Sequence, residues 1–187
     1  MSKLRLLSGI VIGASWFTLA GRWLWGARGG EQATAVRMSG GNAAWIAANV
    51  VAFAGLARFG YRLRKGRRPM AAAGATLAVA GVATSLLARR ELGTNWSKDA
   101  ALVEHQELVR EGPYSLMRHP IYTGFIALMT GTALFAASAG AWLLVAAHAV
   151  FLLRKALEED ALLEDEFGED YGAYRAETPA FVPGLKR

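Results

Sequence analysis

The chain has 187 residues, of which 53% are hydrophobic and 19% are charged, and it contains no cysteine. Soluble domains have fewer apolar and more charged residues, so the composition favours a membrane protein and excludes a disordered chain. The lack of cysteine excludes disulfide scaffolds, thiol nucleophiles and iron–sulfur clusters. A net charge of +6 fits nucleic acid or an anionic membrane surface. Because the basic residues cluster between apolar runs, we expect membrane lipids, and not nucleic acid, as partners.

Five apolar segments are predicted to cross a membrane as helices, since a spanning helix needs roughly 20 residues. In chain order they are residues 6–25, 43–61, 70–88, 120–137 and 139–153. The first has a long apolar stretch with no clean cleavage site after it, which argues against a signal peptide. No stretch shows the sustained alternation of a β-strand. We therefore predict an all-α integral membrane helical bundle with about five transmembrane helices.

The polar groups capable of chemistry are concentrated in residues 89–118 and in the tail, residues 154–187. Because only a short turn separates the fourth and fifth apolar segments, these two polar stretches are predicted to emerge on the same side of the membrane. We divide the chain into N-terminal transmembrane helices (1–88) and a C-terminal helical subdomain (89–187). The tail is predicted to be one helix over residues 154–177 that ends before Pro179.

The stretch 107–124, ELVREGPYSLMRHPIYTG, is the most informative part of the sequence. Pro120 disfavours a helical conformation at His119 and suits the first turn of a helix, so a helix is predicted to begin there. The unpaired amides of such a helix start attract anions. In the tail, Arg154 and Glu158 are four residues apart, on one helical face. Together these groups would suit a zwitterionic amino acid at the membrane surface.

These motifs resemble the isoprenylcysteine carboxyl methyltransferase family and its relatives, the phospholipid N-methyltransferases. The resemblance rests on GPY, RHPIYTG, the acidic residues of the tail and FGEDYGAY, and it covers residues 92–183. It implies that residues 89–187 form a catalytic subdomain, in which the loop before the fourth segment and the tail enclose S-adenosyl-L-methionine. The implied reaction is carboxyl O-methylation of a lipid or prenylated acceptor, most like isoprenylcysteine. Phospholipid (ethanolamine) N-methylation is the alternative reaction. A non-catalytic membrane scaffold or transporter subunit is a second alternative, although no inverted repeat is visible.

By family position, the resemblance implies a set of cofactor-binding residues: Gln106, Leu108, Val109, Tyr114, His119, Pro120, Ile121, Tyr122, Glu158 and Glu159. Gln106 stands where the family often has histidine. The resemblance also implies Arg154 and Glu158 as catalytic residues, with Arg154 facing the acceptor. Counting back from FG moves the acidic pair to Glu159 and Asp160, so it stays open which two of the three carboxylates bind the cofactor. The three histidines lack the spacing of zinc ligands, so no metal is expected.

Two indicators of membrane orientation conflict. The short basic loop 62–68, RLRKGRR, favours a cytoplasmic position for that loop. A cofactor made in the cytosol instead requires residues 89–118 and the tail to be cytoplasmic. We expect a multi-pass membrane protein with its catalytic side in the cytoplasm.

Overall fold

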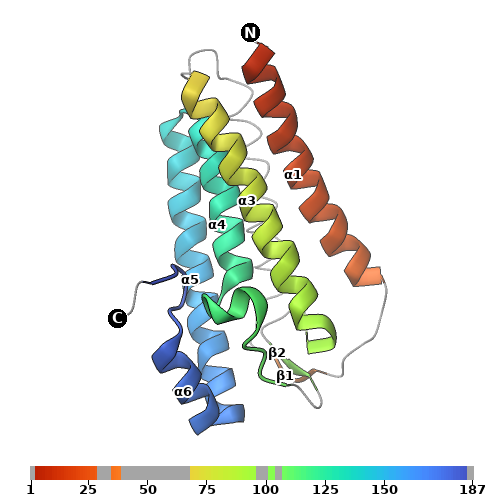
Figure 1. Cartoon of the computed structure of the whole chain (residues 1–187), viewed down its shortest axis with the longest axis vertical. Helices are drawn as coiled ribbons and strands as arrows, with labels where there is room; N and C mark the ends of the chain where they lie inside the picture. The colour runs from red at the N-terminus through yellow and green to blue at the C-terminus, as the bar shows by residue number, and fades with distance from the viewer. Residues whose placement is uncertain (1–2, 29–34, 39–67, 96–100, 104–106, 185–187) are drawn as a thin grey trace.

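The computed structural model describes residues 3–28, 35–38, 68–95, 101–103 and 107–184. In this part of the chain, the long helices lie along one another as a bundle, and a short helix follows at one end (Figure 1). They are α1 (Lys3–Arg28), α3 (Arg68–Leu92), α4 (Pro120–Ala136), α5 (Ala139–Phe167) and the short α6 (Glu169–Glu177). The predicted all-helical membrane bundle is confirmed. The second predicted span, residues 43–61, lies outside the described residues.

Three of the described helices are long and apolar enough to cross a membrane: Lys3–Arg22, Pro69–Leu92 and Ala139–Phe167. Helix α4 is apolar and shorter, with 17 residues, which is the lower end of the range for a helix that spans the hydrocarbon core. It begins at Pro120, as predicted from the restriction that proline places on His119.

One pair of short strands was not predicted. In the described part of the chain, β1 (Ala35–Met38) pairs antiparallel with β2 (Ala101–Val103). Strands of three and four residues are too short for an alternating pattern to be recognised in the sequence. Two 3-10 turns, η1 (Gly93–Asn95) and η2 (Gly112–Ser115), complete the described elements.

Helices α3 and α4 touch backbone to backbone through glycine. A Cβ atom added at Gly81 would lie 2.4 Å from the carbonyl oxygen of Gly124, and one added at Gly74 would lie 2.4 Å from that of Gly131. Small residues allow this approach, which supplies van der Waals contact in a lipid environment where hydrophobicity cannot drive association. Beside Gly124, the hydroxyl of Ser85 donates a hydrogen bond of 3.1 Å to the carbonyl of Ile121.

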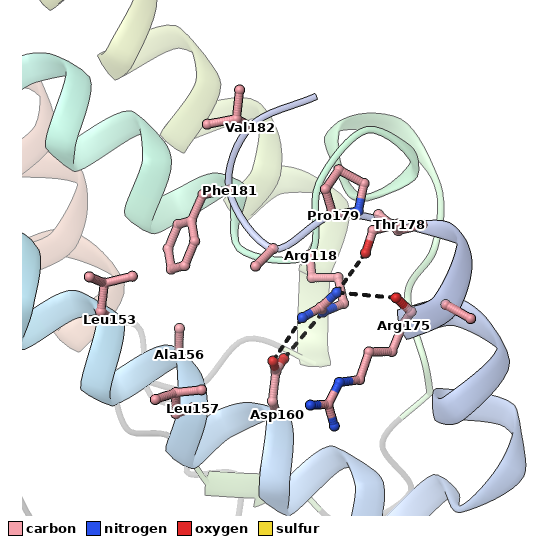
Figure 2. Close-up of a pocket in the computed structure, with 12 residues that line it drawn as sticks. Arg118, Leu153, Ala156, Leu157, Asp160, Arg175, Thr178, Pro179, Phe181 and Val182 are labelled. Carbon is pink, nitrogen blue, oxygen red and sulfur yellow. Dashed lines mark hydrogen bonds and ion pairs between the residues drawn. The ribbon is translucent and has the colours of Figure 1, made fainter. Parts of the chain in front are cut away.

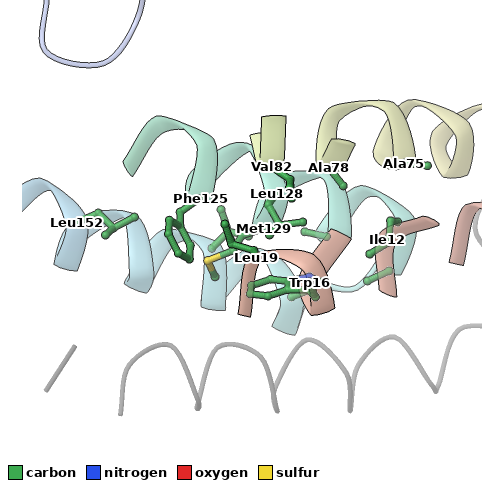
Figure 3. Close-up of a cluster of buried hydrophobic side chains, with 14 residues drawn as sticks. Ile12, Trp16, Leu19, Ala75, Ala78, Val82, Phe125, Leu128, Met129 and Leu152 are labelled. Carbon is green, nitrogen blue, oxygen red and sulfur yellow. The ribbon is translucent and has the colours of Figure 1, made fainter. Parts of the chain in front are cut away.

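Helix α1 joins the bundle through a cluster of apolar side chains that includes Leu128 and Met129 of α4 (Figure 3). The indole nitrogen of Trp16 donates a hydrogen bond of 3.0 Å to the hydroxyl of Thr132, so the polar edge of this buried ring has a partner. The core thus holds α3 and α4 in fixed positions relative to α1.

The α4–α5 hairpin is tight, because Ala137 adopts a left-handed conformation (φ 47°) and α5 begins at Ala139. This brings the start of α4 and the polar half of α5 to the same end of the bundle, as predicted. The prediction of one tail helix over residues 154–177 is wrong. Helix α5 ends at Phe167, and the chain turns at Gly168 (φ 50°, ψ −121°) before α6 begins.

Candidate functional site

The chain after α6 returns to the start of α4 and pairs with it through backbone hydrogen bonds. The amide of Arg118 donates to the carbonyl of Pro179 at 2.9 Å, and that of His119 donates to Ala180 at 3.0 Å. The hydroxyl of Thr123 lies 3.1 Å from the carbonyls of both His119 and Phe181. We call residues 178–182 the strap. The strap fixes the conformation of Arg118 and His119 where the helix begins.

Asp160 of α5 is the centre of a buried polar cluster. It accepts two hydrogen bonds from the guanidinium of Arg118, Nη2 to Oδ2 at 3.0 Å and Nε to Oδ1 at 3.4 Å. It also lies 2.8 Å from Nε2 of His119 and accepts a hydrogen bond from the hydroxyl of Tyr171. The side chain of Asp160 is only 7% exposed, so its charge is balanced by these partners and not by water.

The guanidinium of Arg118 is fully occupied. Besides Asp160, its Nη1 donates to the carbonyl of Thr178 at 2.6 Å and to that of Arg175 at 3.4 Å (Figure 2). Arg118 therefore ties α5 and the end of α6 to the start of α4. The guanidinium is planar and has five donors, so it is suited to such a junction. A lysine ammonium cannot reproduce this geometry.

His119 lies between two carboxylates and two aromatic rings. Its Nδ1 is 3.4 Å from Oε2 of Glu159, and its ring stacks on Tyr122 at 5.7 Å between centroids and lies 5.5 Å from Phe181. Burial alone would lower the pKa of His119, but the hydrogen bonds and negative charges of Asp160 and Glu159 outweigh it and raise the pKa to about 8. At neutral pH the imidazolium form, which donates from both nitrogens, is favoured.

Tyr114 brings a further aromatic ring to the same end of the bundle. It lies in η2, whose first residue Gly112 has φ 56°, a conformation that glycine adopts without strain. The carbonyl of Tyr114 accepts a hydrogen bond of 2.7 Å from the hydroxyl of Tyr174, so the turn is fixed to α6. Burial and the negative charge of Glu159 raise the pKa of Tyr114, which keeps its phenol neutral.

A cavity of about 640 Å³ lies between α5 and the strap, with Arg118 and Asp160 in its wall (Figure 2). Much of the remaining lining is apolar and consists of Leu153 and Leu157 of α5 and Phe181 and Val182 of the strap. Leu153 and Leu157 are 45% and 64% exposed, so the cavity continues into an apolar surface of α5. Such a cavity suits an apolar chain better than a polar ligand.

The structure brings some of the predicted site residues together. His119 and Glu159 are in contact, and Tyr122 stacks on His119. Tyr114 is close enough to Glu159 for that negative charge to raise its pKa. Pro120 is buried in the first turn of α4. Leu108, Val109 and Ile121 are half-buried, and Gln106 lies outside the described residues.

Arg154 and Glu158 are not part of this cluster. Both are exposed on α5, whereas Glu159 and Asp160 are the two carboxylates that contact His119. Arg154 is five residues before Glu159, which corresponds to about 7.5 Å along the helix axis. The roles predicted for Arg154 and Glu158 in catalysis stay predictions.

Sequence reasoning missed three contributors to the cluster. It assigned no role to Arg118 or Tyr171, and it did not predict that the strap would pair with the start of α4. The sequence did contain a signal for Asp160. Counting back from Phe167-Gly168 places the acidic pair at Glu159 and Asp160, one residue later than Glu158 and Glu159.

Comparisons with known proteins agree on one family. The sequence model of a family described as "Phospholipid methyltransferase" matches residues 69–170, which include α4, α5 and all but the first residue of α3. A curated relative, "Protein-S-isoprenylcysteine O-methyltransferase B" of Arabidopsis thaliana, is 36% identical over 83 residues, which are 43% of this chain and 41% of the relative. The chain thus matches about two-fifths of the length of that relative.

Proposed function

Because this chain belongs to the phospholipid methyltransferase family, we propose that it transfers a methyl group from S-adenosyl-L-methionine to a lipid-borne acceptor at the membrane surface. The observation that carries the proposal is the buried cluster of Arg118, His119 and Asp160, with Glu159 at its edge. This cluster lies inside the region that matches the family, and it assembles a carboxylate, aromatic rings and a helix start at one place.

The residues present fit the charges of this cofactor. The carboxylate of Glu159 is 37% exposed, so it is available to bind the ammonium group of an amino acid. The amides of Ile121 and Tyr122 lie in the first turn of α4, where the side chain of the N-cap residue His119 forms no capping hydrogen bond, and they would bind a carboxylate. The faces of Tyr114 and Tyr122 would attract a sulfonium cation. When bound, the cofactor supplies an electrophilic methyl group.

The acceptor that we favour is the carboxylate of a prenylated cysteine. This class follows from the name of the curated relative. A carboxylate is already anionic at neutral pH, so the protein needs only to orient it and to exclude water. Apolar Leu153 and Leu157 border the cavity beside the site and would suit a prenyl chain.

Arg154 is the cation that we assign to this carboxylate. Arg118 is occupied by Asp160, and the other two arginines of the neighbourhood, Arg110 and Arg175, pair with acidic residues at 3.8 Å and 2.6 Å. Within the described part of the chain Arg154 forms no ion pair, so its guanidinium is available for bidentate binding. We propose that Glu158, one turn later on the same face, orients it.

Methylation of a phospholipid amine is the second candidate, favoured by the description of the matching family. An amine must lose a proton before it accepts a methyl group, so a carboxylate near the acceptor would assist it. Glu158 is exposed on α5 and would serve as that base. We further propose a multi-pass arrangement with this end of the bundle in the cytoplasm, where the cofactor is made.

The test is a methylation assay with the full chain in lipid nanodiscs and S-adenosyl-L-methionine labelled in its methyl group. Farnesylated N-acetylcysteine and phosphatidylethanolamine are supplied separately. Alkali releases methanol from a methyl ester but not from an N-methylamine, so the label identifies the reaction. We expect label in the ester. Glu159→Gln should abolish cofactor binding, and Glu164→Gln, an exposed acid that pairs with Arg175, should not. If neither acceptor is labelled while the protein binds the cofactor, the acceptor assignment is wrong.

A further inference from the structure

A second amphipathic site lies away from the His119 cluster, between α1 and α3. There a groove of about 570 Å³ separates the two helices near their C-terminal ends. Its lining includes two arginines, Arg22 of α1 and Arg90 of α3, and three apolar side chains, Phe17, Leu86 and Leu87. None of the described residues that line it is acidic.

The groove is positioned where a membrane meets water. The apolar segment of α1 ends at Arg22 and that of α3 ends at Leu92, so both arginines lie at the ends of candidate spans. Phe17, five residues earlier in α1, is 74% exposed, and Leu87 of α3 is 55% exposed. The groove therefore has an apolar half that faces the hydrocarbon and a cationic half at the level of the headgroups.

Gly21 keeps the groove open. A Cβ atom added at Gly21 would meet no described atom within 4 Å, whereas one added at Gly74 or Gly81 would collide with α4. Gly21 is thus not required for contact between α1 and the other described helices. Gly21 lines the groove together with Phe17 and Arg22.

We propose that this groove is a binding site for an anionic glycerophospholipid. The headgroup phosphate lies between Arg22 and Arg90, and one acyl chain passes over Gly21 along Phe17 and Leu87. Two guanidinium groups, with no acid among the described residues that line the groove, favour a lipid with net negative charge, because a zwitterionic headgroup carries its own cation. The proposal does not rest on methyl transfer, and α1 lies outside the region that matches the family.

The test is native mass spectrometry of the full chain in detergent, titrated with phosphatidylglycerol or with phosphatidylcholine of the same acyl chains. We expect one phosphatidylglycerol to bind at least about 10-fold more tightly than phosphatidylcholine. Each of Arg22→Gln and Arg90→Gln should weaken phosphatidylglycerol binding about 10-fold, the effect of one charged hydrogen bond. Gly21→Leu should weaken it by a similar factor without a change in charge. Excess glycerol 3-phosphate should not displace the lipid, since it lacks the acyl chain.

Two variants serve as matched controls. Gly13→Leu adds the same side chain to α1 at a second glycine with nothing within 4 Å, and Lys3→Gln removes a charge at the other end of the helix. Both should bind phosphatidylglycerol like the wild type. Equal affinity for the two lipids, or unchanged affinity in the Arg22→Gln/Arg90→Gln double variant, would overturn the proposal. Displacement by glycerol 3-phosphate would also overturn it, in favour of a soluble phosphate ligand. If Gly21→Leu does not fold, the arginine variants, whose side chains are exposed, decide the question.

Discussion

His119 and Asp160 are 41 residues apart in the chain, and Nε2 of one lies 2.8 Å from Oδ1 of the other in a buried environment. The contact joins the first turn of α4 to the polar half of α5. Asp160 also holds Arg118 and Tyr171, so a single carboxylate connects the start of α4 with α5 and α6. The site proposed for the cofactor therefore depends on the negative charge of Asp160.

The protonation of His119 is expected to make stability depend on pH. Its pKa is raised from 6.5 to about 8 in the folded chain, so the folded state binds this proton more tightly than the unfolded state. The resulting stabilisation, about 2 kcal/mol, is present in full below pH 6.5 and is lost as the pH rises through 8. Thermal unfolding in detergent should show a fall in Tm over this window that His119→Gln lacks. Parallel pH profiles for the two proteins would contradict the prediction.

Arg118→Ala is expected to release the strap. It leaves the carboxylate of Asp160 buried with one partner fewer and removes the donor to the carbonyl of Thr178. Removal of one member of a buried ion pair costs about 3–5 kcal/mol, so the free energy of unfolding of Arg118→Ala in mixed micelles should fall by this amount. Limited proteolysis should then cut within residues 178–182. Arg175→Gln breaks an exposed ion pair with Glu164 and should cost less than about 1 kcal/mol. Equal losses in the two variants would argue against a special role for Arg118.

The sequence predicted those features that depend on local chemistry. Pro120 fixed the start of α4, and the length of the apolar runs predicted α1, α3 and α5. The break at Gly168 was missed because a single glycine in a polar helix is tolerated, and only its φ of 50° shows that the helix ends there.

The contacts of Asp160 could not be predicted from periodicity, since they depend on how α5 is rotated against the start of α4. A shift of one residue along a helix turns the side chain by 100°, which separates the exposed Glu158 from Glu159. The return of the strap to His119 is a contact between residues about 60 positions apart, and no local pattern encodes it.

The contact between α3 and α4 is expected to tolerate no added methyl group at Gly81. The new Cβ would lie 2.4 Å from the carbonyl oxygen of Gly124 and 2.7 Å from the amide nitrogen of Leu128, both of them backbone atoms that cannot rotate away. Gly81→Ala should destabilise the protein by about 1–3 kcal/mol, seen as a lower Tm. Gly13→Ala makes the same change where nothing lies within 4 Å and should have little effect. Unchanged stability in Gly81→Ala would show that the helices are further apart.

The orientation of the bundle can be tested with cysteine labelling, because the chain has no thiol of its own. We expect Gly184→Cys, after the strap, to be shielded from an impermeant maleimide in intact cells. Ser138→Cys, in the α4–α5 turn at the opposite end, should be labelled. The reverse pattern would place the His119 cluster outside and agree with the basic loop 62–68 as the cytoplasmic signal.

The role of Arg154 separates the two candidate reactions. If the acceptor is a carboxylate, loss of the guanidinium removes its charged hydrogen-bond partner, at a cost of roughly 2–4 kcal/mol, or ~30- to 1,000-fold in rate. Arg154→Lys should restore only part of this, because a point charge lacks the planar fork. The affinity for S-adenosylhomocysteine should barely change, since Arg154 lies away from Glu159 and His119. If the acceptor is an amine, a nearby cation hinders it, and Arg154→Ala should be neutral or faster.

Single-turnover methylation measures this effect without the contribution of product release. Wild type, Arg154→Lys and Arg154→Ala are compared with farnesylated N-acetylcysteine and with phosphatidylethanolamine. Arg110→Ala is the matched control, because this exposed arginine interacts with Asp170 and should not contact the acceptor. A large loss confined to the carboxylate acceptor supports the assignment of Arg154. An Arg154→Ala enzyme that methylates the farnesylated cysteine at the wild-type rate would exclude Arg154 as the group that binds the carboxylate, whatever the identity of the cofactor residues.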